Sequence, residues 1–448
     1  ISKVSQTMQY THILIIGAGM AGTRFAMQYA KSRLSAHSGL GIDSQGEQSQ
    51  DEFAITLINS EPYAGYNRIM LSPVLAGEKR FAEIYLFSQE EYANHNITVK
   101  TGCTVSDINL AAHQVITDSG ETIGYDKLVF ATGSTPFILP LPNHTAKGVM
   151  GFRTKADVDA MLDIAKNNHN GKKSPKCLVI GGGLLGLEAA NALVQQGAKV
   201  TVVHGAGYLL NRQLDKTAAD LLQTYFENKG IEFVLNANSQ AICVDKDNQV
   251  TGLTYTDNVD TSIPAKTIDT DCIIMTVGVR PNIALAQQVG ITCERGILVD
   301  NQMRTHTPDV YAIGECVQFD NQLFGLVAPV YEQANILLHT LNEQPGSTSP
   351  VFSVQPTATK LKVSGVALFS AGDIDVSHDC EQLIYQDPSH SIYQKITVKD
   401  NRILSAVLYG DVQEGGWFFE LIQNQQDISA IKDKLLFGKA FCEELLAG

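Results

Sequence analysis

Residues 12–22, HILIIGAGMAG, join a short apolar run to a glycine-rich turn. The run has no polar alternation, which is typical of a buried parallel strand, and the residues after the glycines have helical spacing. Gly17, Gly19 and Gly22 form the pattern G-x-G-x-x-G between the two. The first glycine allows a tight turn, the second lets a pyrophosphate approach the backbone, and the third lets helix and strand pack closely. The stretch therefore predicts a dinucleotide-binding domain.

The same unit occurs a second time in the chain. Residues 177–183, CLVIGGG, read as a strand that ends in glycines, and Gly181, Gly183 and Gly186 repeat the fingerprint. Residues 198–204, AKVTVVH, read as the next strand. Two dinucleotide sites in one chain imply two different dinucleotides that face each other.

A carboxylate follows the first fingerprint at the expected kind of position. Glu61 ends the strand-like segment ITLINSE, residues 55–61, where it can accept hydrogen bonds from an adenosine ribose. The interval from Gly22 is longer than usual, and the small, polar residues 35–52 are interpreted as a surface insertion that accounts for it.

The second fingerprint has different residues around it. His204 replaces the acidic residue after the strand, which removes a carboxylate that would repel a 2′-phosphate. NADH and NADPH both remain open. Glu188 lies in the first turns of the following helix, where the helix dipole favours a carboxylate. The plainer alternative for Glu188 is a simple helix N-terminal charge.

Composition narrows the class of protein. The 448 residues are 44% hydrophobic and 18% charged, and their formal charge is −14, which argues against a nucleic-acid or anionic-membrane surface. The sequence shows neither a signal peptide nor a membrane helix, so a cytoplasmic location is expected. The eight cysteines are scattered without a C-x-x-C pair, which favours reduced structural thiols and predicts no metal site.

The remainder of the chain predicts a separate C-terminal part. Residues 341–350, LNEQPGSTSP, have the composition of a linker, and alternating segments from Ala358 onwards indicate antiparallel strands closed by helical sequence around 428–445. We expect an α/β protein with two Rossmann-like domains and a small α+β C-terminal domain. The predicted FAD-binding domain comprises residues 1–149 and 271–345, the NAD(P)-binding domain 150–270, and the C-terminal domain 346–448.

The motifs in their order resemble the FAD- and NAD(P)-binding reductases of the glutathione-reductase fold. They are GAGMAG, Glu61, ATG at 131–133, GGGLLGLE, TVGVRPN and YAIGE. Within that superfamily, the segments 66–80, 202–215 and 300–317 resemble the reductase module of NAD(P)H-dependent nitrite reductase large subunits and their nitrate-assimilation relatives. The resemblance implies FAD and NADH or NADPH as cofactors, and a redox acceptor protein or domain as the partner.

The resemblance also implies site residues. Those for FAD are Gly17, Gly19, Gly22, Glu61, Arg68, Val105, Thr132, Gly133, Glu315, Ala328 and Pro329. Those for NAD(P) are Gly181, Gly183, Gly186, Glu188 and Gly278. His204 is added to this set because it directly follows the strand after the second fingerprint. No residue is predicted to act as a dedicated acid or base, because hydride transfer between two bound rings needs close stacking.

The residue after Leu71 and Ser72 separates the reductase classes. Relatives that reduce peroxide, oxygen or disulfides have a redox cysteine there, and ferredoxin and rubredoxin reductases frequently have a lysine; this chain has Pro73. Proline offers neither thiolate nor ammonium, so electrons must pass directly onward. The leading interpretation is therefore an electron-transfer module of a nitrite reductase or nitrate-assimilation system, whose acceptor is an iron-sulfur and sirohaem nitrite reductase module. The alternatives are a rubredoxin or ferredoxin reductase, whose acceptor is rubredoxin or ferredoxin, and an interaction protein of the apoptosis-inducing-factor type. A homodimer is compatible with the sequence, which does not determine the oligomeric state.

Overall fold

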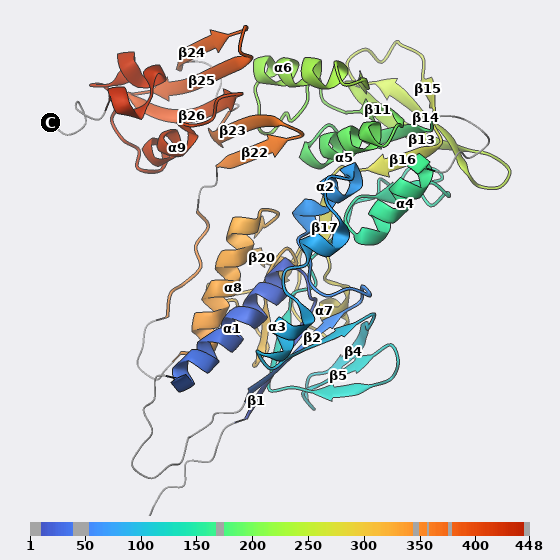
Figure 1. Cartoon of the computed structure of the whole chain (residues 1–448), viewed down its shortest axis with the longest axis vertical. Coiled ribbons are helices and arrows are strands. Elements are labelled where there is room, and N and C mark those ends of the chain that lie inside the picture. Colours follow the sequence, from blue (N-terminus) through green and yellow to red (C-terminus); the bar gives the residue numbers. More distant parts are fainter. Residues whose placement is uncertain are drawn as a thin grey trace, which may run out of the picture. The chain divides into compact units, whose positions relative to one another are not determined.

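The computed structural model describes residues 10–38, 53–166, 174–343, 349–355, 358–374 and 379–442, without the side chains of 36–38 and 361–363. The chain divides into two compact units. The first comprises Ile1–Met70, Arg80–Thr135 and Val279–Val354; the second comprises Leu71–Lys79, Pro136–Gly278 and Gln355–Gly448. Figure 1 shows the elements of each unit in the colours of the sequence.

The first unit contains a parallel five-stranded sheet. In spatial order its strands are β19 (Val310–Ala312), β7 (Lys127–Phe130), β1 (Thr11–Ile16), β2 (Phe53–Asn59) and β3 (Ile97–Thr101). Ile13, Leu14 and Ile15 of β1 are fully buried, which explains a run without polar alternation. Helices α1 (Met20–Ser38) and α8 (Val327–Leu341) lie side by side (Figure 1).

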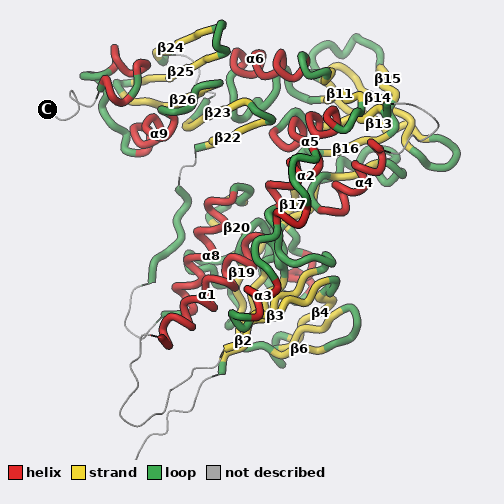
Figure 2. The backbone as a smooth tube through the Cα atoms, in the orientation of Figure 1, coloured by secondary structure: helices red, strands yellow, loops and turns green. Residues whose placement is uncertain are grey.

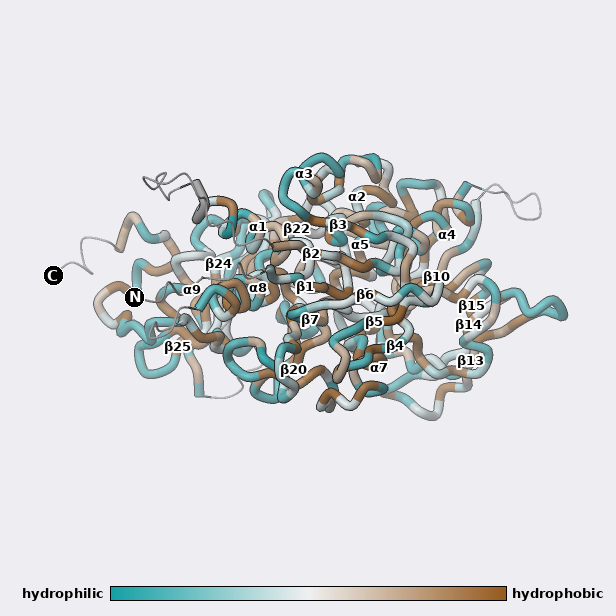
Figure 3. The backbone as a smooth tube through the Cα atoms, turned by 90° about the horizontal axis from the view of Figure 1, so that it is seen from below, coloured by the Kyte–Doolittle hydropathy of each residue, from teal (hydrophilic) through white to brown (hydrophobic). Residues whose placement is uncertain are grey.

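Shorter elements complete the first unit. They are η1 (Arg68–Met70), η2 (Phe81–Ile84), α3 (Gln89–Ala93), α7 (Ala284–Gln288), β4 (Val105–Asn109), β5 (Gln114–Thr117), β6 (Thr122–Gly124), β8 (Ser134–Pro136), β17 (Val279–Pro281), β18 (Ile297–Leu298), β20 (Val317–Phe319) and β21 (Gln322–Leu323). Strands β4, β5 and β6 form an antiparallel meander (Figure 2). In Figure 3, α3 is coloured as hydrophilic, in keeping with its two acidic residues in the first turn.

The second unit repeats the parallel sheet. Its strands in spatial order are β12 (Ile231–Val234), β11 (Lys199–Val203), β10 (Lys176–Ile180), β16 (Cys272–Met275) and β9 (Val149–Gly151). The helices are α2 (Leu71–Ala76), α4 (Lys155–Lys166), α5 (Leu184–Gln195) and α6 (Lys216–Glu227), and a meander is made by β13 (Ala237–Val244), β14 (Val250–Asp257) and β15 (Lys266–Asp269). Both dinucleotide-binding sheets of the predicted α/β fold are thereby confirmed.

The C-terminal part of the second unit is an antiparallel sheet with one α-helix. The strands in spatial order are β22 (Thr359–Val363), β23 (Val366–Gly372), β26 (Arg402–Tyr409), β25 (Ile392–Lys399) and β24 (Glu381–Asp387), and α9 (Gly415–Gln423) packs on β26 and β23. Tyr393 on β25 donates a hydrogen bond to Asp215, the N-cap of α6, at 2.6 Å. Lys395 pairs with the same carboxylate at 3.3 Å, so this sheet is tied to α6.

Three expectations differ from the structure. Helix α1 continues to Ser38, so residues 35–38 are helical, and the rest of the predicted insertion, 39–52, lies outside the described residues. In the helical sequence expected around 428–445, the described residues up to 442 form only the short 3-10 helices η4 (Lys432–Phe437) and η5 (Lys439–Phe441), while α9 comes earlier. Strand β16 lies in the second sheet, although the predicted boundary gave residues 271–278 to the first domain. The three-domain division itself stays a prediction.

Among the described residues, no helix has both the length and the apolar content to cross a membrane. The described residues also contain no group of three or more His, Cys, Asp or Glu placed to hold a metal ion.

Candidate functional site

The predicted ligand-binding residues divide between the two units. Every residue predicted to hold FAD lies in the first unit, and every residue predicted to hold NAD(P) lies in the second. In both sheets the fingerprint follows the carboxyl end of the central strand, which is where open α/β sheets bind nucleotides. The predicted domains separated the two sets in the same way except for Gly278, which the predicted boundary gave to the FAD-binding domain and which lies in the second unit.

The first fingerprint leaves free space only at its middle glycine. Gly17 has φ +113°, and a Cβ built on it would lie 2.1 Å from the carbonyl oxygen of Ala131. A Cβ on Gly22 would lie 2.1 Å from the carbonyl oxygen of Gly17. A Cβ on Gly19, in contrast, meets nothing within 4 Å. The crowded glycines are therefore required by packing, and the open one faces space in which a pyrophosphate fits.

The second fingerprint has the same geometry. A Cβ on Gly181 would lie 2.7 Å from the carbonyl oxygen of Thr276, and one on Gly186 would lie 1.9 Å from the carbonyl oxygen of Gly181. Gly183, the N-cap of α5, again faces open space. The N–H groups of the first helical turn have no partner within a helix, so this opening suits an anion. The residues present thus fit two dinucleotides, one in each unit.

Glu61 and Arg68 are brought together beyond the end of β2. The Arg68 guanidinium pairs with Oε1 of Glu61, and the hydroxyl of Tyr66 donates to Oε2 of Glu61 at 2.7 Å. Tyr66 is buried, and the Arg68 guanidinium also lies over its ring, with 4.9 Å between Cζ and the ring centroid. Each carboxylate oxygen has two lone pairs, so Glu61 keeps acceptor capacity for ribose hydroxyls. Tyr66, which is not among the predicted site residues, is thus a hydrogen-bond partner of Glu61.

The turn at Thr132 and Gly133 is held by Asn282, which sequence reasoning missed. The Thr132 hydroxyl donates to the carbonyl of Asn282 at 2.7 Å, and the Asn282 amide donates to the carbonyl of Thr132 at 3.0 Å. The backbone N–H of Asn282 also donates to the carbonyl of Gly133 at 2.9 Å. The signal in the sequence was the place of Asn282 at the end of the motif TVGVRPN, directly after Pro281.

Glu315 follows the strand β19 and a tight turn at Gly314, which has φ +91°. Its carboxylate accepts a hydrogen bond from the hydroxyl of Ser134, and the N–H of Gly314 donates to Gln333 Oε1 at 2.7 Å. Gln333 on α8 is fully buried, and it is a second residue that the sequence did not single out. A polar side chain in the core of this unit therefore fixes the turn that carries Glu315.

Three other FAD candidates are placed by their elements. Val105 is buried at the start of β4. Ala328, which is exposed, and Pro329, which is half-buried, lie in the first turn of α8, where a proline is tolerated because its missing N–H would be unpaired in any case.

In the second unit, Glu188 on α5 meets Ser72 on α2. The Ser72 hydroxyl donates to Oε2 of Glu188 at 2.7 Å. Burial raises the pKa of Glu188, and the hydrogen bond from Ser72 opposes that shift. Gly278 has φ +117°, and a Cβ built on it would meet no atom within 4 Å. Its carbonyl accepts a hydrogen bond from the backbone N–H of Phe137 at 2.8 Å.

His204 lies directly after β11, as the sequence predicts, but its ring points to the glycine loop. Nδ1 of His204 accepts a hydrogen bond from the backbone N–H of Gly182 at 3.1 Å, and Nε2 is 3.3 Å from Oδ1 of Asn211. Burial lowers the pKa of His204, which keeps the imidazole neutral. The residue is therefore a structural partner of the fingerprint.

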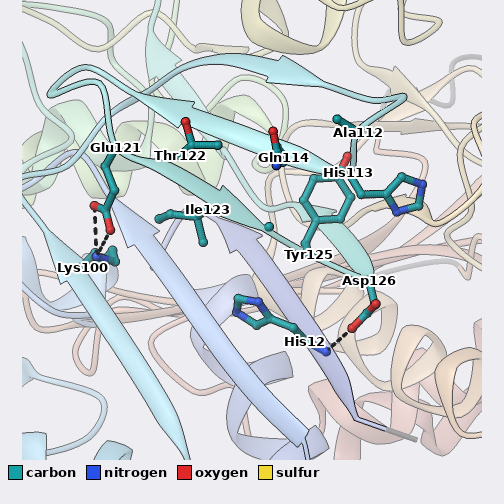
Figure 4. A pocket seen from close by; sticks show the side chains of 11 residues that line it. His12, Lys100, Ala112, His113, Gln114, Glu121, Thr122, Ile123, Tyr125 and Asp126 are labelled. Atoms are coloured by element: carbon teal, nitrogen blue, oxygen red, sulfur yellow. Dashed lines mark hydrogen bonds and ion pairs between the residues drawn. The ribbon is translucent and has the colours of Figure 1, made fainter.

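One cavity of the first unit is lined by none of the predicted site residues. It has a volume of about 570 Å³ and is lined by His12, Lys100, His113 and Tyr125, with Lys100 paired to Glu121 (Figure 4). His12 is the second residue of β1, so the cavity lies at the amino end of the strand, opposite the fingerprint. A second cavity of about 710 Å³ is lined by Pro62, Tyr63 and Thr101, at the carboxyl ends of β2 and β3 where Glu61 also lies.

Comparison with known proteins agrees with this geometry. Residues 11–336 match the family model described as pyridine nucleotide-disulphide oxidoreductase, and residues 357–426 match that of the rubredoxin NAD+ reductase C-terminal domain. The chain is 39% identical to "Nitrite reductase [NAD(P)H]" of Bacillus subtilis (strain 168), over 93% of this chain and 48% of that protein. It is 36% identical to the "Assimilatory nitrate reductase electron transfer subunit" of the same organism, over 96% of this chain and 51% of that protein.

The solved structure of NADH:rubredoxin oxidoreductase from Clostridium acetobutylicum superposes with a TM-score of 0.73 at 28% identity, covering 96% of this chain and 100% of that one. The chain spans about half the length of the two curated relatives described above. The predicted resemblance to the FAD- and NAD(P)-binding reductases of the glutathione-reductase fold is confirmed. The chain belongs to the pyridine nucleotide-disulphide oxidoreductase family, as an FAD-dependent NAD(P)H oxidoreductase.

Proposed function

We propose that this chain is the electron-transfer module of a nitrite- or nitrate-assimilation system, in which electrons from NADH or NADPH reach a redox partner through FAD. The observation that carries the proposal is the duplicated fingerprint, with one open middle glycine in each compact unit. The printed names of the two Bacillus subtilis relatives support the choice of system. Bound FAD supplies the exchange between a two-electron hydride donor and one-electron acceptors.

The residues of the first unit hold and orient FAD. Backbone N–H groups after Gly17 and at Gly19 receive the pyrophosphate at the N-terminus of α1, and Glu61 accepts hydrogen bonds from the adenosine ribose while Arg68 steadies the carboxylate. Glu315 accepts from hydroxyls of the ribityl chain, with Ser134 fixing its carboxylate. Val105, Thr132 and Gly133 would line the remaining length of the cofactor, and Ala328 and Pro329 would contact its flavin end.

The residues of the second unit bind NAD(P)H. Gly181, Gly183 and Gly186 shape the loop for the pyrophosphate, and Glu188 and Gly278 line the nicotinamide end. His204 leaves both NADH and NADPH acceptable, because a neutral imidazole neither repels a 2′-phosphate nor replaces the carboxylate that selects a 2′-hydroxyl.

Electrons leave without a covalent relay in this proposal. Pro73 occupies the position at which a thiol would act. All eight cysteines are free, which fits a reducing compartment such as the cytoplasm, and Cys316, the one next to Glu315, is fully buried. Its Sγ donates to the carbonyl of Ile313 at 3.2 Å, so it serves packing.

A second acceptor is favoured by one observation. Residues 357–426 match the C-terminal domain of rubredoxin NAD+ reductases, which supports rubredoxin as the partner in place of a nitrite reductase module.

The test is a competition between acceptors. The purified chain, reduced anaerobically with NADH, is mixed in a stopped-flow instrument with a sirohaem nitrite reductase module, with rubredoxin or with a [2Fe-2S] ferredoxin, and reoxidation of the flavin is followed. We expect the sirohaem module to react fastest. Faster reoxidation by rubredoxin or ferredoxin would assign the chain to the second acceptor class, and equally slow reoxidation by all three would contradict an electron-transfer role.

A further inference from the structure

Helix α2, LSPVLA, contains one polar side chain, that of Ser72. Ser72 is buried, together with Leu71, Val74 and Leu75. Burying a hydroxyl costs free energy unless the hydroxyl is hydrogen-bonded. An alanine at this buried position would avoid that cost, so the serine needs a hydrogen-bond partner. The partner that satisfies the hydroxyl is Glu188, 116 residues further along the chain.

Glu188 is a half-buried carboxylate held by a neutral group. It lies in the second turn of α5, five residues after Gly183, on the helix whose N-terminus forms the second fingerprint. The residue after Ser72 is Pro73, which brings no charge to this position. A hydroxyl donor fixes the orientation of the carboxylate but leaves its negative charge and its remaining lone pairs available.

The chemistry of the nicotinamide end matches such an acceptor. Its carboxamide carries two N–H donors, and an ionised carboxylate can only accept. The geometry of such a hydrogen bond decides how the ring lies, and a displacement of about 1 Å from the reactive geometry can cost about a hundredfold in rate. A group that prevents the carboxylate from rotating therefore acts on the rate of hydride transfer.

We propose that Ser72 is a positioning residue for NAD(P)H, whose hydroxyl fixes the Glu188 carboxylate so that the nicotinamide is held in the orientation that reacts. This inference rests on the proposed function, and specifically on the assignment of Glu188 to the nicotinamide end. Ser72 itself touches neither cofactor in this account and acts through Glu188.

The first experiment is anaerobic stopped-flow reduction of the flavin in the full chain over a range of NADH and NADPH concentrations. In Ser72→Ala we expect the limiting reduction rate to fall about tenfold, the effect of losing one hydrogen bond to a charged group, while the dissociation constant of NAD(P)H changes less. Alanine is the better helix former, so α2 should persist. Ser72→Thr, which keeps the hydroxyl, should restore most of the rate, and Ser262→Ala, at an exposed serine of the same unit, should match the wild type.

The second experiment is a double-mutant cycle with Glu188→Gln. If Ser72 acts through Glu188, Ser72→Ala will add little to the loss already caused by Glu188→Gln. Equal losses from Ser72→Ala in both backgrounds would show a general packing role and overturn the inference, as would a wild-type limiting rate in Ser72→Ala. A wild-type chain whose flavin NAD(P)H does not reduce would overturn the proposed function itself, which makes the two failures distinguishable.

Discussion

Gly182 is held at both of its backbone polar groups by the segment that follows β11. Its N–H donates to Nδ1 of His204 at 3.1 Å, and its carbonyl accepts from the N–H of Leu210 at 3.0 Å. A Cβ at position 182 would lie 2.8 Å from Cγ of His204, so the imidazole packs directly on the loop. The second fingerprint is therefore shaped by His204 as well as by its own glycines.

Replacement of His204 by alanine should weaken the binding of NAD(P)H without affecting FAD. The Gly182 N–H loses its acceptor and the loop loses its packing partner, so we expect the dissociation constant for NAD(P)H to rise about tenfold, corresponding to one lost hydrogen bond. Titration of the flavin spectrum with NADP+ and NAD+ measures this. His144→Ala, at an exposed histidine of the same unit, is the control, and an unchanged constant in His204→Ala would show that the loop is self-supporting.

The same contact predicts a pH dependence. Burial lowers the pKa of His204 below the ordinary 6.5, so Nδ1 keeps its lone pair for Gly182 throughout the neutral range. As the pH falls below 6.5, the unfolded chain takes up a proton at this residue before the folded chain does, so stability declines towards acid. NAD(P)H binding should stay constant as the pH falls to 6.5 and weaken only further into acid, where the lowered pKa of folded His204 is reached. In His204→Ala the weakening of NAD(P)H binding at acid pH should disappear. If binding still weakens at acid pH in this variant, another group is responsible.

Alanine substitutions at Gly17 and Gly19 should have different consequences. A Cβ on Gly17 collides with the carbonyl of Ala131 and requires a strained backbone, so we expect Gly17→Ala to lose about 3 kcal/mol or more of unfolding free energy. Gly19→Ala meets no protein atom within 4 Å, so the apoprotein should fold with nearly wild-type stability but bind FAD poorly.

Thermal unfolding of the apoprotein and the ratio of flavin to protein absorbance separate the two effects. Full FAD content in Gly19→Ala would contradict the placement of the pyrophosphate at the first fingerprint.

The proposed electron transfer uses no cysteine thiol as a relay, and the reactivity of Cys293 tests this. Burial raises its pKa to about 11, so roughly one molecule in a thousand is ionised there at pH 8. Alkylation of Cys293 by iodoacetamide at pH 8 should be slow, as followed by peptide mass spectrometry. Cys293→Ser should reduce its flavin with NADH at the wild-type rate. Rapid alkylation coupled to loss of activity would contradict the absence of a relay.

The sequence predicts the parts of this fold whose signals are local. Gly17 and Gly181 follow fully apolar strands, and that order of strand, glycine and helix is legible without any tertiary contact. The end of α1 was misplaced because Ser35 and His37 suggest a loop, whereas the helix continues through them to Ser38. Helix α9 was missed because it starts at two glycines, which usually indicate a turn.

The site contacts that were missed join residues far apart in the chain. The hydroxyl of Ser72 meets Glu188, and Asn282 meets Thr132 across 150 residues, so neither pair leaves a pattern in a local window of sequence. His204 was found because it occupies a fixed place after a strand, but the atom to which it bonds depends on how the following loop folds back.

The most direct test of the central claim is anaerobic titration of the purified chain with NADH and with NADPH while the visible flavin spectrum is recorded. We expect one FAD per chain, bleached by one equivalent of at least one of the two nucleotides. A chain that binds no FAD, or whose flavin neither nucleotide bleaches, would contradict it.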